Sequence, residues 1–106
     1  MGLTASVLTK FAKMMMSMRG VRINRVNNIP VRRRKNTVEK GWADLQGYTR
    51  VGVYVAVEIK TINDKLSLDQ IQRLTDIVEC GGLAYICTED NEGKPKLIQF
   101  SDLLKK

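Results

Sequence analysis

The run from Val51 to Lys60, with sequence VGVYVAVEIK, constrains the fold more than any other part of the chain. Its odd positions are all β-branched, and alternation of this kind places them on one face of a strand. The residues predicted on this core face are Val51, Val53, Val55, Val57 and Ile59. Tyr54 and Ala56 make the opposite face partly apolar too, which is typical of a sheet covered by helices on both sides.

The remaining predicted elements also favour an α/β fold. In chain order we expect a helix over 3–18, strands over 21–27, 44–48 and 51–61, a helix from Ser67 to near Gly81, strands over 83–88 and 96–100, and a short turn capped by Ser101. The chain has 106 residues, which is near the lower limit for an unstapled α/β core. We therefore expect a single domain over residues 1–106, with a small mixed β-sheet flanked by helices.

The first predicted helix carries an apolar stripe. We expect this stripe to face the core or a second copy of the chain, because flexible thioethers fill irregular gaps well. A methionine-rich groove for varied partners is the alternative. The stripe consists of Leu8, Phe11, Met15 and Met18, with Gly20 ending the helix.

Glu58 and Lys60 interrupt the apolar strand and are expected to emerge side by side at its end. Removing such a pair from water is costly unless another charge lies nearby. Mg²⁺ or Mn²⁺, held by Glu58, by the Asp44 carboxylate and by the backbone carbonyl of Ile59, would supply that charge. Such an ion lowers the pKa of bound water and stabilises charge on a phosphate, and Lys60 adds a point-charge donor. The spacing therefore predicts a metal-dependent phosphodiester-cutting site.

A structural alternative for the same residues is a turn at Asp44 and a surface ion pair between Glu58 and Lys60. Gln70 also has two possible roles. In the pattern from Ser67 to Gln70 its side chain can close a helix capping box, support the site, or do both.

Several motifs occur in one order along the chain: Gly41-Trp42-Ala43-Asp44-Leu45, then Glu58-Ile59-Lys60-Thr61, Lys65-Leu66-Ser67-Leu68-Asp69-Gln70 and Gly81-Gly82-Leu83-Ala84. With these motifs the chain, from its first helix to about Thr88, resembles the VRR-NUC (virus-type replication-repair) nucleases of the PD-(D/E)xK superfamily. The resemblance implies a restriction-endonuclease-like core and a structure-selective DNA endonuclease. It implies Asp44 and Glu58 as metal ligands, Lys60 as the catalytic lysine and Gln70 as a helix residue that supports the site or the phosphate.

Standalone viral members of that family resemble homodimeric Holliday-junction resolvases. The resemblance thus implies a homodimer acting on branched DNA in the cytoplasm of a bacterial host, from a phage or prophage. An inactive or weakly active nuclease-fold DNA-binding module is one alternative, and a flap or single-strand nuclease is another. The acid-poor, arginine-rich N-terminus also has the character of a mitochondrial targeting segment, which is a minor alternative.

The sequence departs from the family pattern at two places. Ala43 replaces the proline that usually precedes the acid, and residues 3–19 contain no Asp or Glu, although members usually carry a metal-binding acid there. Three explanations stay open: Thr4 or Ser6 holds a metal-bound water, Glu39 reaches the site from a loop, or metal binds weakly.

Positive charge is concentrated in the first third of the chain. Residues 1–40 hold ten Lys or Arg against Glu39 alone, a net charge of +9, whereas the whole chain has a net charge of +7. We expect a basic loop over residues 28–42, mobile without substrate, to contact DNA phosphates without reading sequence. A solvated loop with no such role is the alternative. The predicted DNA-contacting residues are Arg32, Arg33, Arg34, Lys35 and Lys40.

Other classes of site and location are disfavoured. Cys80 and Cys87 are the only cysteines and histidine is absent, so a zinc site lacks half its ligands, and both thiols are expected to be reduced and mostly buried. No run of about twenty apolar residues occurs, so the sequence predicts no membrane span.

Overall fold

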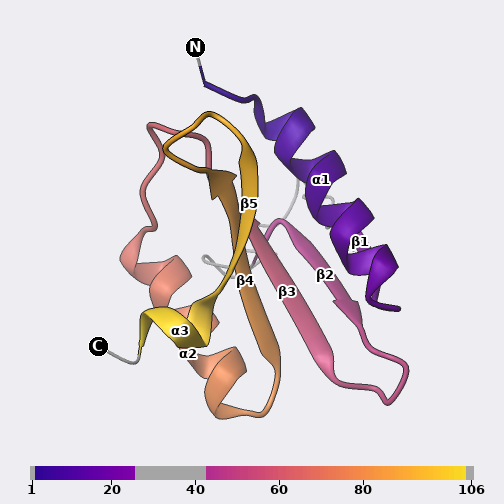
Figure 1. Ribbon diagram of the computed structural model, residues 1–106. Helices are drawn as coiled ribbons and strands as arrows, with labels where there is room; N and C mark the ends of the chain where they lie inside the picture. The colour runs from indigo at the N-terminus through magenta and orange to yellow at the C-terminus, as the bar shows by residue number, and fades with distance from the viewer. Residues whose placement is uncertain (1, 26–42, 105–106) are drawn as a thin grey trace, which may run out of the picture.

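The computed structural model describes residues 2–25 and 43–104, which form a mixed five-stranded sheet flanked by helices (Figure 1). This architecture confirms the predicted fold class. The strands lie in the order β1-β2-β3-β4-β5. Their bounds are β1 Arg22–Arg25, β2 Leu45–Tyr48, β3 Tyr54–Ile59, β4 Leu83–Glu89 and β5 Pro95–Gln99, and the helices are α1 Ala5–Met18, α2 Leu68–Glu79 and α3 Phe100–Leu103.

One strand pair determines where a site can form. β3 and β4 are parallel, whereas β1–β2, β2–β3 and β4–β5 are antiparallel. Parallel neighbours need a crossover, and α2 supplies it by returning the chain so that β4 lies beside β3. The carboxyl end of β3 therefore leads into the loop before α2, and ligands of open α/β sheets bind at such ends.

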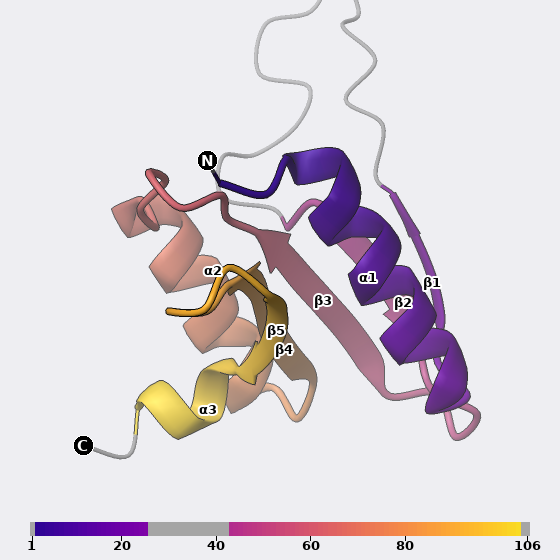
Figure 2. The ribbon, with the colours of Figure 1, turned by 45° about the horizontal axis from the view of Figure 1, so that its top comes forward.

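Two apolar layers cover the sheet, and Figure 2 shows α1 and α2 on either side of β3. Side chains of α1 pack on one face, and those of α2 and α3 on the other. The first layer contains Leu8, Ala12, Met16, Leu45, Val55, Val57, Ile59, Tyr85 and Cys87. The second contains Ala43, Ala56, Leu74, Ile77, Ala84, Ile86 and Phe100.

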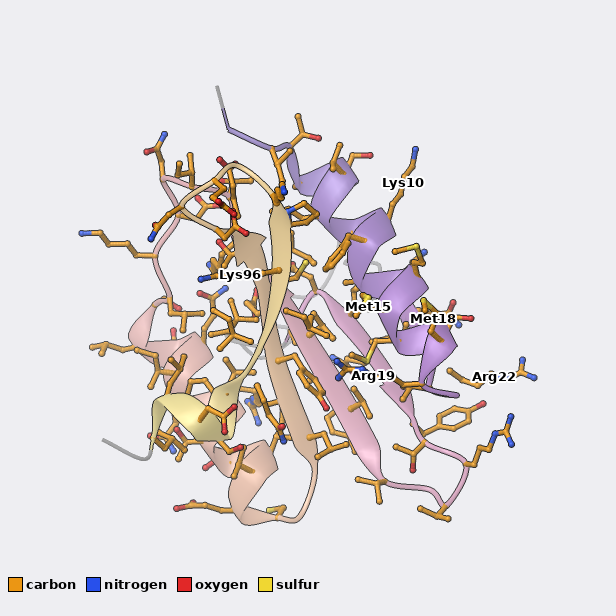
Figure 3. All side chains as sticks on the ribbon, in the orientation of Figure 1. Lys10, Met15, Met18, Arg19, Arg22 and Lys96 are labelled. Atoms are coloured by element: carbon orange, nitrogen blue, oxygen red, sulfur yellow. The ribbon has the colours of Figure 1, made fainter. Side chains whose placement is uncertain are left out.

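The buried stripe of α1 differs from the predicted one. Leu8, Ala12 and Met16 are fully buried, whereas the side chain of Met18 is 75% exposed. Figure 3 shows Met18 on the helix near its end, and Phe11 and Met15 are only partly buried. The spacing of the apolar residues predicts a helix but not how that helix is rotated on the sheet. The observed rotation places the small side chain of Ala12 against the sheet.

Both long helices end as predicted. Gly20 has φ of 76°, with its N–H bonded to the Ser17 carbonyl and that of Val21 to the Met16 carbonyl. Gly81, with φ of 92°, ends α2 in the same way. These left-handed positions favour glycine and satisfy the last helix carbonyls.

The strand predicted from Val51 begins later than expected. Val51 is 86% exposed, and Gly52 has φ of 82°, which interrupts the extended run. Thr49 closes the turn by accepting hydrogen bonds from the N–H groups of Val51 and Val53. Regular alternation starts only at Tyr54, so the prediction that Val51 faces the core is wrong.

Two smaller predictions also fail. Ser101 does not cap α3, because the N-cap residue is Gln99 and no side chain closes the cap. Cys80 is exposed, whereas Cys87 is buried as predicted and burial raises the pKa of its thiol to about 11. The Cys87 Sγ donates to the Leu8 carbonyl across the interface between β4 and α1.

The basic loop predicted over residues 28–42 lies outside the described residues. The same holds for Arg32, Arg33, Arg34, Lys35, Lys40 and Glu39, whose roles stay predictions. Within the described part of the chain, no helix is both long and apolar enough to cross a membrane.

Candidate active site

Glu58 is the only charged residue buried among those described, with 1% of its surface exposed. It lies on β3, on the face that α2 covers. Its Oε1 accepts a hydrogen bond of 3.0 Å from the amide Nε2 of Gln70. Its Oε2 is buried and has no hydrogen-bond partner in the described residues. A carboxylate with one satisfied and one unsatisfied oxygen is costly in an interior unless another group completes it.

Asp44 reaches the same place from the start of β2. The antiparallel register pairs Leu45 with Val57, and one further residue brings Asp44 opposite Glu58. The Asp44 Oδ2 accepts a hydrogen bond of 2.9 Å from the N–H of Ile59. Backbone pairing thus holds the two carboxylates together. Asp44 is itself exposed, so the pair has one buried member and one that solvent can reach.

Burial is the main cause of the raised pKa of Glu58, which reaches about 9. The neighbouring carboxyl of Asp44 raises this pKa further, while the positive charge of Lys60 opposes the rise. In the metal-free protein Glu58 is therefore protonated at neutral pH. Two adjacent carboxylates can both ionise only when a cation compensates their charge.

The oxygen atoms at this position fit a hard divalent cation. Asp44 offers an exposed carboxylate, and Glu58 offers an oxygen with no donor among residues 2–25 and 43–104. The carbonyl of Ile59 belongs to the residue whose N–H binds Asp44. Carboxylate and carbonyl oxygens are the ligands that Mg²⁺ and Mn²⁺ prefer. The described residues contain no group of three or more His, Cys, Asp or Glu side chains placed to hold one metal ion, so backbone oxygen or water would have to complete the shell.

Lys60 follows β3 directly and is half-buried. Its N–H continues the β3–β4 pairing by bonding to the carbonyl of Cys87, and its Nζ donates to the carbonyl of Lys65 at 3.3 Å. The ammonium group is thus held over the loop between β3 and α2, close enough to lower the pKa of Glu58. The partner carbonyl of Lys65 was not predicted, because a backbone acceptor leaves no signal in the sequence.

The Gln70 side chain closes the helix cap and also contacts Glu58. Its Oε1 accepts from the N–H of Ser67 at 2.9 Å, and its own N–H donates to the Ser67 hydroxyl, which closes the capping box. This use of Oε1 fixes the orientation of the amide, so that Nε2 points to Glu58. The cap of α2 and the buried carboxylate are therefore linked through one side chain.

A pair of variants separates the two roles of Gln70. Ser67→Ala and Gln70→Ala should each lower the free energy of unfolding by about 1 kcal/mol, because each opens the cap. Only Gln70→Ala also removes the donor to Glu58, so only it should raise the pKa of Glu58 further. Urea unfolding checks the first effect, and NMR titration of the Glu58 carboxyl carbon checks the second. Equal carboxyl titrations in the two variants would contradict the link.

The first helix supplies hydroxyl groups rather than acids at its start. Thr4 is the N-cap residue of α1 and its Oγ1 accepts from the N–H of Val7 at 3.2 Å. The N–H of Leu3 donates to Glu89 at the end of β4, which places the start of α1 at the same end of the sheet as Asp44. A metal-bound water on Thr4 or Ser6 stays a prediction.

Comparison with known proteins supports the fold. No protein-family model matches the sequence, and no curated protein sequence matches it. The structure is similar to that of Hjc from Archaeoglobus fulgidus, a Holliday junction resolvase from an archaeal hyperthermophile, with a TM-score of 0.58 and 17% identity, over 91% of this chain and 77% of that chain. Identity this low carries the fold and nothing more. The chain therefore has the restriction-endonuclease-like fold that the sequence predicted, a mixed sheet flanked by helices.

Proposed function

We propose that the protein is a Mg²⁺- or Mn²⁺-dependent DNA endonuclease of the VRR-NUC type that hydrolyses phosphodiester bonds in branched DNA. The observation that carries the proposal is the buried Glu58, which lies beside Asp44 with a pKa of about 9 and one oxygen that has no donor in the described part of the chain. Strongly shifted acids at the carboxyl end of a strand are concentrated at functional sites.

Each residue of the site has a defined role in this proposal. Asp44, Glu58 and the carbonyl of Ile59 would hold the cation, and Gln70 orients Glu58. The bound cation supplies a water of lowered pKa and a positive charge beside the phosphate. Lys60, released from the Lys65 carbonyl, donates a hydrogen bond to the attacking water or to the charged phosphate oxygens.

The proposed substrate is a four-way junction and the proposed assembly is a homodimer. The fold is shared with a protein that is a Holliday junction resolvase. A two-fold dimer presents two equivalent sites, which suits paired cuts in two strands of like polarity. The predicted basic residues from Arg32 to Lys40 would add phosphate contacts.

Cleavage of labelled DNA tests the proposal. Wild-type protein should cut a four-way junction into symmetrically nicked duplexes with Mg²⁺ or Mn²⁺, and EDTA should stop the reaction. Flap, single-stranded and linear duplex DNA of the same sequence serve as competing substrates. An Asp44→Ala preparation, purified identically, controls for contaminating nucleases. Cutting that continues in EDTA, or that Asp44→Ala retains in full, would exclude this metal-dependent mechanism.

A second candidate function is a DNA-binding module that retains the fold without activity. It is favoured by the absence of Asp and Glu in residues 3–19 and by the small number of acidic ligands at the site. Calorimetry with Mn²⁺ separates the candidates. The endonuclease should take up metal in a manner that depends on Asp44 and Glu58, whereas an inactive module should bind junction DNA without such uptake.

A further inference from the structure

A basic groove of about 1060 Å³ lies along the edge strand β1, away from the carboxylate pair. Among the residues that the structure describes, its lining contains three cations and no acid. The polar groups that line it otherwise are hydroxyls and amides, which donate hydrogen bonds to phosphate oxygens. The lining includes Lys13, Arg22, Asn24, Gln46, Tyr48 and Arg50.

The groove lies at the β1 edge of the sheet, where α1 borders it on one side and the face that carries Glu58 borders it on the other. Arg22 pairs with Tyr48, and Tyr48 pairs with Tyr54, so all three side chains lie on the face that carries Glu58. Asn24 and Gln46 lie on this face by the same register. On this face α2 packs against β3 and β4, and towards β1 the surface becomes exposed, with Tyr48 at 58% exposure.

Positive charge frames this open surface. Arg22 and Arg50 are exposed, and Lys13 borders the groove from α1. Figure 3 shows the Arg22 side chain projecting outward from the edge of the molecule. Arg50 reaches back across the end of α1, with its Nε 3.3 Å from where a Cβ on Gly20 would lie. Three cations without an acid among them form an attractive surface for a polyanion.

The sheet geometry sets the distance between this surface and the carboxylate pair. Arg22 and Tyr48 lie level with Tyr54, four residues before Glu58 on β3, which is about 14 Å along the strand. β1 is two strands from β3, which adds about 10 Å across the sheet. The separation is therefore about 17 Å, or roughly five base pairs of duplex DNA.

We propose that this groove binds the sugar-phosphate backbone of a DNA arm, about five base pairs from the phosphate that is cut. The inference rests on the proposed endonuclease function for the identity of the polyanion. It assigns duplex contacts to Lys13, Arg22 and Arg50, which are separate from the basic residues 32–40. The contacts are made to phosphates, so they add affinity and orientation without reading sequence.

Equilibrium binding to a four-way junction in EDTA tests the groove without any cleavage. The double variant Arg22→Gln/Arg50→Gln is compared with Lys10→Gln/Lys94→Gln, which removes the same net charge from exposed positions outside the groove lining. Loss of two phosphate contacts should make the slope of log affinity against log salt shallower by about 1.8 and weaken binding at 150 mM salt about 30-fold. The control should change both quantities much less.

Hydroxyl-radical footprinting gives a second readout of position. Wild-type protein and the control should protect the backbone about five base pairs from the cut site, and the Arg22→Gln/Arg50→Gln variant should lose that protection while keeping protection at the cut site. Circular dichroism verifies that both double variants are folded. Lys13→Gln should cause a smaller loss of the same backbone protection.

The outcomes separate this inference from the proposed function. Equal salt slopes for the two double variants would exclude a DNA-binding role for the groove, even if wild-type protein cuts junctions. A groove-dependent slope in a protein that cuts no DNA would retain the groove and exclude the endonuclease.

Discussion

Replacement of Glu58 by Gln should stabilise the metal-free protein and abolish DNA cleavage. In wild type the buried carboxyl has a pKa of about 9, whereas its ordinary value is 4.5. Folding at neutral pH therefore requires proton uptake by Glu58, which costs free energy. Glutamine is neutral at every pH. Its carbonyl can accept from Gln70 Nε2, and its amide can donate to Asp44, so the variant keeps the geometry without that cost.

The sign of the pH dependence follows from the raised pKa. Below about pH 4.5 Glu58 is protonated in both states, and its full favourable contribution to folding is present. As pH rises towards 9 the unfolded state releases this proton first, so wild-type stability falls over that range. Glu58→Gln should remove this slope and should exceed wild type in unfolding free energy by about 3 kcal/mol at pH 7.

Urea unfolding in EDTA from pH 5 to 9 measures this difference. Glu79→Gln, at an exposed position at the end of α2, is the matched control and should keep the wild-type slope. Loss of an anionic metal ligand should reduce junction cleavage by on the order of 1,000-fold. If Glu58→Gln were less stable than wild type at pH 7, with an unchanged slope, the carboxyl would not titrate as described.

Local periodicity accounts for the part of the fold that the sequence predicted. The alternation from Tyr54 to Ile59 and the capping pattern at Ser67 depend on neighbouring residues, and both are present. The predicted stripe of α1 was right for Leu8 and Phe11, which pack in the core, and wrong for Met18, which is exposed. The side of α1 that faces the sheet is set by packing on β3 and β4, which a helical period does not contain. The prediction for Val51 was wrong because the hairpin turn extends to Gly52, so β3 begins only at Tyr54.

The candidate site combines contacts that depend on local sequence with contacts that depend on long-range packing. The meeting of Asp44 and Glu58 depends on the hairpin register, which the turn through Gly52 sets by pairing Leu45 with Val57. The predicted strands over 44–48 and 51–61 would have placed Val55 opposite Asp44, so the sequence offered the pair only through its spacing. The contact between Gln70 and Glu58 depends on how α2 crosses β3, and the sequence offered it only as one of two roles. The basic groove was missed because its cations come from α1, β1 and the β2–β3 turn, and only the sheet brings them together. The local sequence indicated only that Arg22 and Asn24, which alternate with Ile23, lie on one face of a strand.

Burial of Glu58 serves the candidate site but lowers the stability of the fold, because the buried carboxyl is held away from water. α2 is held by its cap, and the same Gln70 fixes the acid whose burial reduces stability at neutral pH. A bound cation would relieve that cost by favouring the ionised carboxylate. Metal binding should therefore stabilise the native state in proportion to its concentration over its Kd.

Lys60→Ala should leave junction binding close to wild type and lower the cleavage rate by on the order of 100- to 1,000-fold, as expected when a donor to a charged transition state is lost. Its Nζ contacts the Lys65 carbonyl in the free protein, so the side chain is not needed for the sheet or for the core. Its loss should also raise the pKa of Glu58 further, because its positive charge now lowers that pKa. Cleavage by Lys60→Ala should consequently recover in part at higher pH.

Single-turnover cleavage with saturating protein separates this chemical role from binding. Lys65→Ala is the matched control, since it removes a neighbouring exposed cation and keeps the backbone carbonyl that Lys60 contacts. Its cleavage rate should stay near wild type. Lys60→Arg retains the charge but not the compact ammonium, and should recover only part of the rate. If Lys60→Ala and Lys65→Ala lost equal activity, the ammonium of Lys60 would act only through the general positive potential, and its placement beside Glu58 would have no catalytic role.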